Sequence, residues 1–152
     1  MTSQVLIPQA SAPALEAWLG LLRAHAAARR LLNAELQGGH GLTVTEFEAL
    51  LLLSKAEQEA LRRVDLADGL QLTPSGVTRL LDGLEEQGLV AKRACAEDAR
   101  VTYAVLTEAG REKLRSASCS HVASVRSFFE ARFSCEELDT LSELLRRLPG
   151  AE

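Results

Sequence analysis

The sequence of 152 residues lacks the features by which several broad classes of protein are recognised. Aromatic residues make up only 4% of it, and no apolar run reaches the ~20 residues that a membrane-spanning helix needs. Residues 1–14 contain no basic start followed by a long apolar core, so a secretory signal is not expected. These absences predict a cytoplasmic protein, without a membrane partner, whose helices pack through aliphatic side chains.

The sequence signatures of common enzymes and metal sites are missing as well. It contains no glycine-rich phosphate loop, no Ser/His/Asp spacing, no HExxH motif and no CxxC pair. Cys95, Cys119 and Cys135 are widely spaced and fit three reduced thiols in a cytosolic protein. His121 stands alone on its predicted helix, which does not favour a metal site. We therefore expect no enzymatic activity, no cofactor and no bound metal.

Positive charge is also scarce. The formal net charge of −4 argues against a protein coated in basic charge for non-specific nucleic-acid binding. Between residues 62 and 113 the sequence has eight Lys or Arg and nine Asp or Glu. A small reader of nucleic acid can nevertheless be acidic overall if its cations converge on one face.

Apolar periodicity and capping residues predict a mainly helical chain with one β-hairpin. Pro13 fits the first turn of a long helix that the Gly38–Gly39 pair is expected to end near residue 37. Thr43 and Glu46 have capping-box spacing at the start of a second helix. Further helices are expected over 62–69, between Thr73 and Gly88, over 107–132 and from Ser134 or Cys135 onward, and strands are expected over 89–95 and 100–106.

Two of these shorter elements have apolar patterns of their own. The helix over 62–69 is expected to use Val64, Leu66, Ala67 and Leu70 as its apolar contacts, with a turn at Gly69. In the second strand, the alternation of Val101, Tyr103 and Val105 is typical of a β-strand.

The stretch "LTPSGVTRLLDGLEEQGLVAKR" (residues 72–93) predicts a helix with one buried face. Thr73 is a good N-cap, Pro74 occupies the first helical position, and Gly88 is a natural helix end. The polar face opens with short hydroxyl side chains and an arginine. The apolar stripe is Val77, Leu80, Leu81 and Leu84, at i, i+3, i+4 and i+7.

A short helix, a turn, a capped helix and a hairpin form, in this order, a winged helix-turn-helix. In that motif the second helix enters the major groove of DNA, where Arg79 would contact a guanine or a phosphate. Ser75 and Thr78 would hydrogen-bond to phosphates or base edges. The alternative is that both are solvated first-turn residues and that Arg79 pairs with Asp82.

Three segments in register resemble the MarR family of bacterial transcriptional regulators. They are "LTPSGVTRLLDGLEEQGLVAKR", then Asp98-Ala99-Arg100, then "LTEAG" at residues 106–110. The resemblance implies a winged helix-turn-helix domain over 41–107, flanked by dimerisation regions at 1–40 and 108–152. It also implies a homodimer on a pseudo-palindromic DNA operator, commonly a repressor that a small, often aromatic, ligand releases.

The resemblance extends to a set of residues expected at the DNA. In the family pattern the acidic residue Asp98 braces Arg100, which approaches the minor groove or its phosphates. The wing tip departs from that pattern, because residues 94–97 read Ala-Cys-Ala-Glu where extra basic residues are common. We therefore expect weaker salt dependence than a strongly basic reader shows. The expected DNA-binding residues are Thr73, Ser75, Gly76, Thr78, Arg79, Lys92, Arg93, Asp98 and Arg100.

Leucine stripes on the first and last helices have no obvious partner inside one chain, which favours a dimer. By the same resemblance, Trp18, Arg23 and His40 are candidates for ligand contact; alternatively, Trp18 belongs to the dimer core and His25 and His40 are solvated. The expected interface residues are Leu15, Trp18, Leu19, Leu22, Leu138, Leu141 and Leu145, with Leu148 extending the last stripe.

Two other functions remain open on the sequence. One is a winged-helix module for protein interaction that does not bind DNA, which the acidic balance motivates. The other is a thiol-based, redox-responsive regulator in which oxidation of Cys95 distorts the hairpin.

Overall fold

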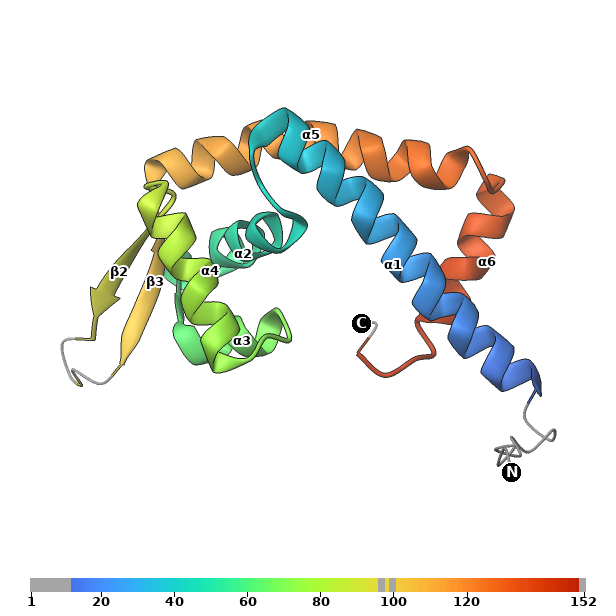
Figure 1. Ribbon diagram of the computed structural model, residues 1–152, viewed down its shortest axis with the longest axis horizontal. Helices are drawn as coiled ribbons and strands as arrows, with labels where there is room; N and C mark the ends of the chain where they lie inside the picture. The colour runs from blue at the N-terminus through green and yellow to red at the C-terminus, as the bar shows by residue number, and fades with distance from the viewer. Residues whose placement is uncertain (1–11, 96–97, 99–100, 151–152) are drawn as a thin grey trace, which may run out of the picture.

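The computed structural model describes residues 12–95, 98 and 101–150 and confirms a mainly helical fold with a small β wing. Figure 1 shows that the long helix α5 connects a compact winged lobe (residues 44–106) to a helical arm, which is formed by α1, α6 and the short segments on either side of α6. The elements are α1 (Ala12–His40), α2 (Val44–Lys55), the 3-10 turn η2 (Glu57–Glu59), β1 (Ala60–Arg62), α3 (Arg63–Gly69), α4 (Pro74–Glu86), β2 (Val90–Ala94), β3 (Thr102–Leu106), α5 (Glu108–Glu130) and α6 (Cys135–Leu145).

Helix α1 continues through Gly38–Gly39 to His40, so the stop predicted at the glycine pair is wrong. Each helical glycine costs about 1 kcal/mol relative to alanine, and contacts with α5 at this end offset that cost. His40 Nε2 lies 2.6 Å from Ser120 Oγ, and Lys113 Nζ donates to the His40 carbonyl. The helix ends instead before Gly41, whose φ of +67° is typical of a helix end.

Helix α2 lies at the centre of the winged lobe and begins with the predicted capping box. The Thr43 hydroxyl accepts from the Glu46 N–H, and the Glu46 carboxylate accepts from the Thr43 N–H at 2.7 Å. The Val44 N–H donates to the Asn33 side chain, which fastens α2 to α1. The core around α2 includes Leu36, Leu42, Phe47, Leu50, Leu53, Leu66, Val77, Leu81, Leu84 and Leu106.

The sequence predicts a two-stranded hairpin and does not predict β1. In the structure β1 pairs with β3, which gives a three-stranded antiparallel sheet in the order β1-β3-β2. The chain enters β1 through Gln58 and Glu59, both with a φ of +52°. Left-handed backbone at residues other than glycine is uncommon. Arg111 of α5 holds this turn, because its Nη2 lies 2.7 Å from the Glu59 carboxylate.

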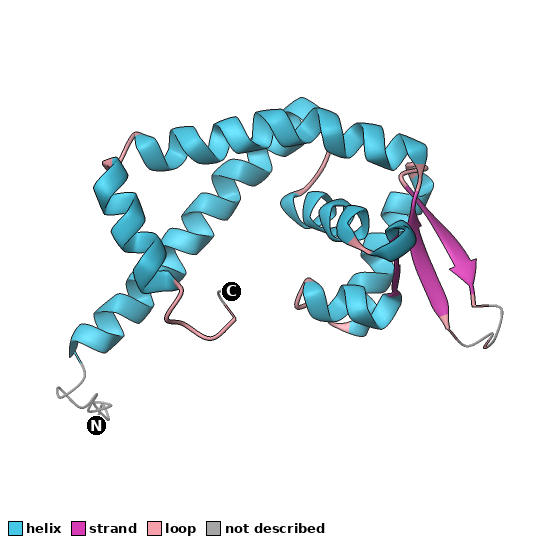
Figure 2. Ribbon diagram, turned by 180° about the vertical axis from the view of Figure 1, so that it is seen from behind, coloured by secondary structure: helices cyan, strands magenta, loops and turns pink. Residues whose placement is uncertain are grey.

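Helices α3 and α4 form the helix-turn-helix (Figure 2). Leu66 and Ala67 of α3 are buried, but Val64 is 59% exposed, so its predicted role as an apolar contact is wrong. The turn between the helices uses Gln71, with a φ of +53°, whereas Gly69 is the last residue of α3. Leu70 is half-buried against the core.

Helix α4 forms as the sequence predicts. Thr73 caps it, Pro74 is its first residue, and the predicted stripe packs inward. At its end, the Gly88 N–H donates to the Glu85 carbonyl and the Leu89 N–H donates to the Leu84 carbonyl. With a φ of +71° at Gly88, this is a Schellman motif.

The wing hairpin pairs β2 with β3, with Arg93 opposite Tyr103 and Lys92 opposite Ala104. The face of β3 that packs on the core carries Ala104 and Leu106. The predicted alternation of Val101, Tyr103 and Val105 therefore lies on the outer, half-exposed face.

The C-terminal helices begin at hydroxyl caps. Thr107 accepts from the Gly110 N–H at the start of α5, and Ser134 forms a capping box with Glu137 at the start of α6. After α5, the chain turns back into α6 (Figure 1). Across the part of the chain that the structure describes, no helix has both the length and the hydropathy needed to cross a bilayer.

Candidate DNA-binding surface

The start of α4 exposes Thr73 and Ser75 to solvent. Thr73 Oγ1 accepts from the Gly76 N–H and lies 3.2 Å from Ser75 Oγ. A Cβ at Gly76 would lie 3.1 Å from Thr73 Oγ1 and close to Leu72. Glycine at residue 76 therefore leaves room for the Thr73 side chain that caps α4, which explains it without a DNA contact.

The hydroxyl of Thr78 is already committed to its own helix. Its Oγ1 donates to the Pro74 carbonyl at 2.9 Å. The guanidinium of Arg63, at the start of α3, approaches the same oxygen, with Nη1 at 3.5 Å. Thr78 thereby links the two helices of the helix-turn-helix.

The Arg79 side chain projects into solvent next to Thr78, and its guanidinium forms no hydrogen bond or ion pair with any residue that the structure describes. The alternative pairing of Arg79 with Asp82 is not formed. Asp82 instead binds Lys92 of the wing, at 2.7 Å between Nζ and Oδ1. An arginine without a carboxylate partner, on the exposed face of a recognition helix, can bind a base edge or a phosphate without first breaking a salt bridge.

Lys92 is held by two carboxylates of α4. Its Nζ lies 2.7 Å from Asp82 and 2.8 Å from Glu85. The hydrogen bond to Asp82, followed by the one to Glu85, raises the pKa of Lys92 above its ordinary value. A DNA phosphate would have to compete with both carboxylates for this ammonium group, so the predicted DNA contact of Lys92 competes with two ion pairs inside the protein.

The structure adds Arg63 to the candidates, a residue that the sequence analysis did not single out. Its neighbour Arg62 is neutralised by Asp65 through two hydrogen bonds of 2.7 Å each. The bond from Arg62 lowers the pKa of the Asp65 carboxyl. Arg63 is exposed and points toward Thr78. The only available sequence signal was two adjacent arginines before the first helix of the motif.

The structure describes only part of the wing. Arg100 lies outside the described residues, and so does its predicted contact with Asp98, which is exposed. The Arg93 guanidinium lies 5.8 Å from the centroid of the Tyr103 ring, on the outer face of the sheet.

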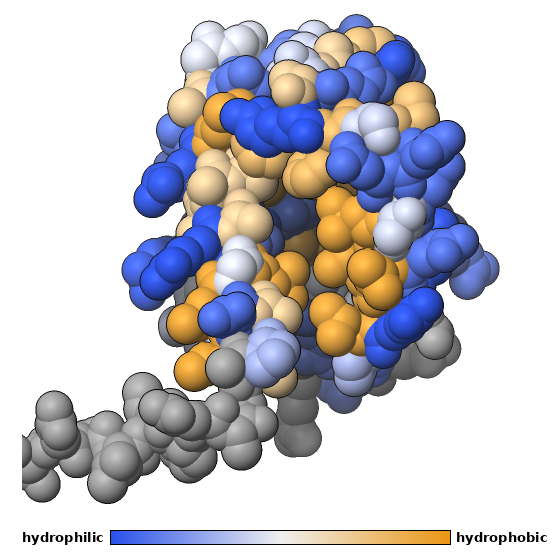
Figure 3. Space-filling model, turned by 90° about the vertical axis from the view of Figure 1, so that its right-hand side faces the viewer, coloured by the Kyte–Doolittle hydropathy of each residue, from blue (hydrophilic) through white to orange (hydrophobic). Residues whose placement is uncertain are grey.

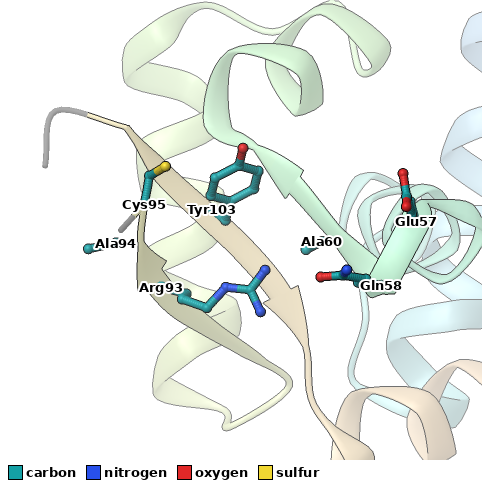
Figure 4. Close-up of a pocket in the computed structure, with 7 residues that line it drawn as sticks. All are labelled: Glu57, Gln58, Ala60, Arg93, Ala94, Cys95 and Tyr103. Carbon is teal, nitrogen blue, oxygen red and sulfur yellow. The ribbon is translucent and has the colours of Figure 1, made fainter. Parts of the chain in front are cut away.

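That outer face carries a concave region of about 440 Å³ (Figure 4). Arg93, Cys95 and Tyr103 line it from the wing, and Glu57 and Gln58 line it from the turn before β1. Cys95 is a half-buried free thiol there, whereas Cys119 and Cys135 are exposed free thiols on the C-terminal helices.

The predicted ligand residues do not meet within one chain. Trp18 and His40 are 22 residues apart on the same helix, which corresponds to about 33 Å. Trp18 is 55% exposed, and Arg23 is also exposed. His40 borders a cavity of about 60 Å³ together with Glu35 and His121. This is much smaller than the ~300 Å³ of a typical small-molecule site.

The fold and this surface define a winged helix-turn-helix protein, and comparison with known proteins identifies its family. A model of the MarR family matches residues 40–101. The HTH-type transcriptional regulator MhqR of Bacillus subtilis is 30% identical over 134 residues, covering 88% of this chain and 90% of that protein. The chain therefore belongs to the MarR family of transcriptional regulators, which are not enzymes.

Two further relatives bear on function. The HTH-type transcriptional repressor YetL of Bacillus subtilis is 33% identical over 107 residues, or 70% of this chain and 64% of that protein. Sco3205, a MarR family regulator from Streptomyces coelicolor solved in complex with DNA, superposes with a TM-score of 0.82. It is 27% identical, and the superposition covers 93% of this chain and 89% of that one.

Proposed function

We propose that this protein is a homodimeric, sequence-specific DNA-binding repressor that a small molecule releases from its operator. The observation that carries the proposal is the exposed start of α4. There Ser75 and Arg79 face solvent, and Arg79 has no carboxylate partner among the described residues. The complex of the similar protein Sco3205 with DNA supports the same use of the fold. The similar protein YetL is a transcriptional repressor, which supports the direction of regulation.

The homodimer is supported by apolar surface on the arm. Figure 3 shows apolar side chains gathered around a hollow on the right-hand side of the molecule. Burying such apolar surface between two subunits would stabilise a dimer by about 25 cal/mol per Å². We propose dimerisation regions at 1–40 and 108–152 around a DNA-binding domain at 41–107. On the arm, Leu15, Trp18, Leu19, Leu22, Phe133, Leu144, Leu145 and Leu148 are exposed, and Leu138 and Leu141 are half-buried.

Release by a ligand requires a site large enough to hold a small molecule. The cavity beside His40 is too small for an aromatic ligand, and Trp18 and Arg23 lie at the far end of α1. A ligand site of useful size along α1 would therefore need surfaces from both subunits, or a movement of α1 against α5.

The test is a gel shift with DNA from upstream of the protein's own gene, at two salt concentrations. Arg79→Ala is the test variant, and Arg115→Ala on α5, where Arg115 pairs with Glu112, is a matched loss of one positive charge. We expect Arg79→Ala to weaken binding by about 1–3 kcal/mol and Arg115→Ala to leave it unchanged. Equal binding by wild type and Arg79→Ala would show that Arg79 is not a DNA contact, and no binding by wild type at either salt concentration would favour a winged module for protein interaction.

A further inference from the structure

We infer that Arg63 of α3 is a DNA phosphate contact of this protein and that Thr78 of α4 positions it. This inference rests on the proposed DNA-binding function. It assigns the phosphate contact beside the recognition helix to a residue that precedes that helix by more than ten positions. Lys92, which the sequence places among the expected DNA-binding residues, is bound by Asp82 and Glu85 instead.

Ion pairs within the winged lobe engage two of its described cations. Among the basic residues near the helix-turn-helix, Arg62 is bound by Asp65 and Lys92 by Asp82 and Glu85. Arg63 forms no ion pair with any described carboxylate, and its guanidinium is exposed. In a lobe with more anions than cations, such uncompensated arginines determine where the local potential is positive.

Thr78 and Arg63 are both candidates for the phosphate contact, and the hydrogen bonding of the Thr78 hydroxyl favours Arg63. Its proton points to the Pro74 carbonyl at 2.9 Å, so its remaining capacity is to accept. Phosphate oxygens also only accept, and Thr78 cannot donate to one without breaking its bond within α4. Arg63 Nη1 faces the acceptor side of the hydroxyl at 3.5 Å. This long contact uses one of five guanidinium N–H groups and leaves the others available for a phosphate.

The position of Arg63 favours a phosphate over a base. It is the first residue of α3, and the first helix of a helix-turn-helix crosses the DNA backbone while the second enters the groove. Arg63 and Arg79 approach Thr78 from different elements, one from α3 and one as its sequence neighbour on α4. In this arrangement Arg63 would lie at the DNA backbone beside the major groove, and Arg79 would lie in the groove.

The experiment measures DNA binding by fluorescence anisotropy between about 50 and 200 mM salt. The probes are a duplex that the wild-type protein selects from a random library, and a scrambled duplex of the same length and composition. The variants are Arg63→Ala, Arg63→Lys, Thr78→Val and Arg79→Ala. Arg115→Ala is the matched control, and circular dichroism melts confirm that each variant is folded.

We expect Arg63→Ala to make the slope of log K against log salt shallower by about 0.9 for each Arg63 that contacts a phosphate. It should weaken binding to both duplexes by similar factors, because a phosphate contact carries no sequence information. Arg63→Lys should keep most of the slope. Thr78→Val should lie between wild type and Arg63→Ala, because it leaves the arginine in place without its positioning contact.

Two results would overturn the inference, and they are distinguishable. If wild type binds the selected duplex but Arg63→Ala keeps the slope of Arg115→Ala, Arg63 is not a phosphate contact and the DNA-binding function stands. If wild type selects no duplex from the library, the DNA-binding function fails, and the role of Arg63 fails with it.

Discussion

Among single residues, Gly110 is the one with the least space for a side chain. A Cβ at this position would lie 2.1 Å from the Leu89 carbonyl oxygen and 2.8 Å from Leu106 Cδ1. We expect Gly110→Ala to lower the free energy of unfolding by about 3 kcal/mol, because backbone at the end of α4 cannot move away cheaply. Gly83→Ala is the control: apart from its chain neighbours and the adjacent backbone of α4, no described atom lies within 4 Å of a Cβ placed there. Guanidinium denaturation should show Gly83→Ala to be neutral or stabilising by up to about 1 kcal/mol. Equal losses in the two variants would refute this packing argument.

Lys92 provides a second test at this scale. Because Asp82 and Glu85 already neutralise it, we expect Lys92→Ala to change the salt dependence of DNA binding less than Arg79→Ala does. The same anisotropy titration measures both. A change as large as that of Arg79→Ala would mean that DNA draws Lys92 away from its carboxylates.

The sequence predicts contacts between residues close along the chain better than contacts between distant residues. The caps at Thr43, Thr73 and Ser134 depend on hydrogen bonds within three residues, and all three are present as predicted or as one of the predicted choices. Arg63 contacts Thr78, 15 positions away, and Lys92 contacts Asp82, 10 positions away; only the fold brings these partners close. Composition and periodicity carry no information on such pairs.

At the scale of elements, the errors follow from tertiary contacts that override local signals. Strand β1 has three residues, too few for an alternating pattern, and the turn before it uses left-handed residues without glycine. Helix α1 continues through a glycine pair because α5 binds its end. The long, strongly patterned α4 was predictable, because its cap, stripe and glycine stop all lie within 16 residues of sequence (73–88).

The contact between Glu59 and Arg111 joins the turn before β1 to α5 and makes stability depend on pH. The hydrogen bond from Arg111 lowers the pKa of the Glu59 carboxyl below its ordinary value of 4.5. A carboxyl with a lowered folded-state pKa contributes stability above its unfolded value and loses it as the pH falls through the folded value. We expect Glu59→Gln to melt below wild type at neutral pH, with a difference that shrinks as the pH falls below 4.5.

Thermal melts followed by circular dichroism over a pH series measure this difference. Glu112→Gln is the control, since Glu112 pairs with Arg115 within one exposed turn of α5 and joins no two elements. A difference for Glu59→Gln that stays constant into acid would show that the glutamate acts through packing and not through its charge.

At the scale of the whole molecule, the arm and the winged lobe differ in how their apolar side chains are used. The winged lobe buries a continuous core, whereas the arm exposes leucines, Trp18 and Phe133. A pair of arms that bury this surface together would fix the distance between two recognition helices. Dimerisation would thereby determine the spacing of the DNA half-sites.

We therefore expect Leu19→Glu and Leu22→Glu to raise the dimer dissociation constant by a hundredfold or more, because each places an unpaired charge in apolar surface, a cost of about 3 kcal/mol or more. Light scattering after size exclusion measures the state. Val64→Gln is the control, because Val64 is an exposed apolar residue of α3 outside the arm and should leave the dimer intact. Since both charged variants leave the core of the winged lobe untouched, their far-ultraviolet spectra should remain helical while operator affinity falls. Variants that stay dimeric at wild-type concentrations would place the interface elsewhere on the molecule.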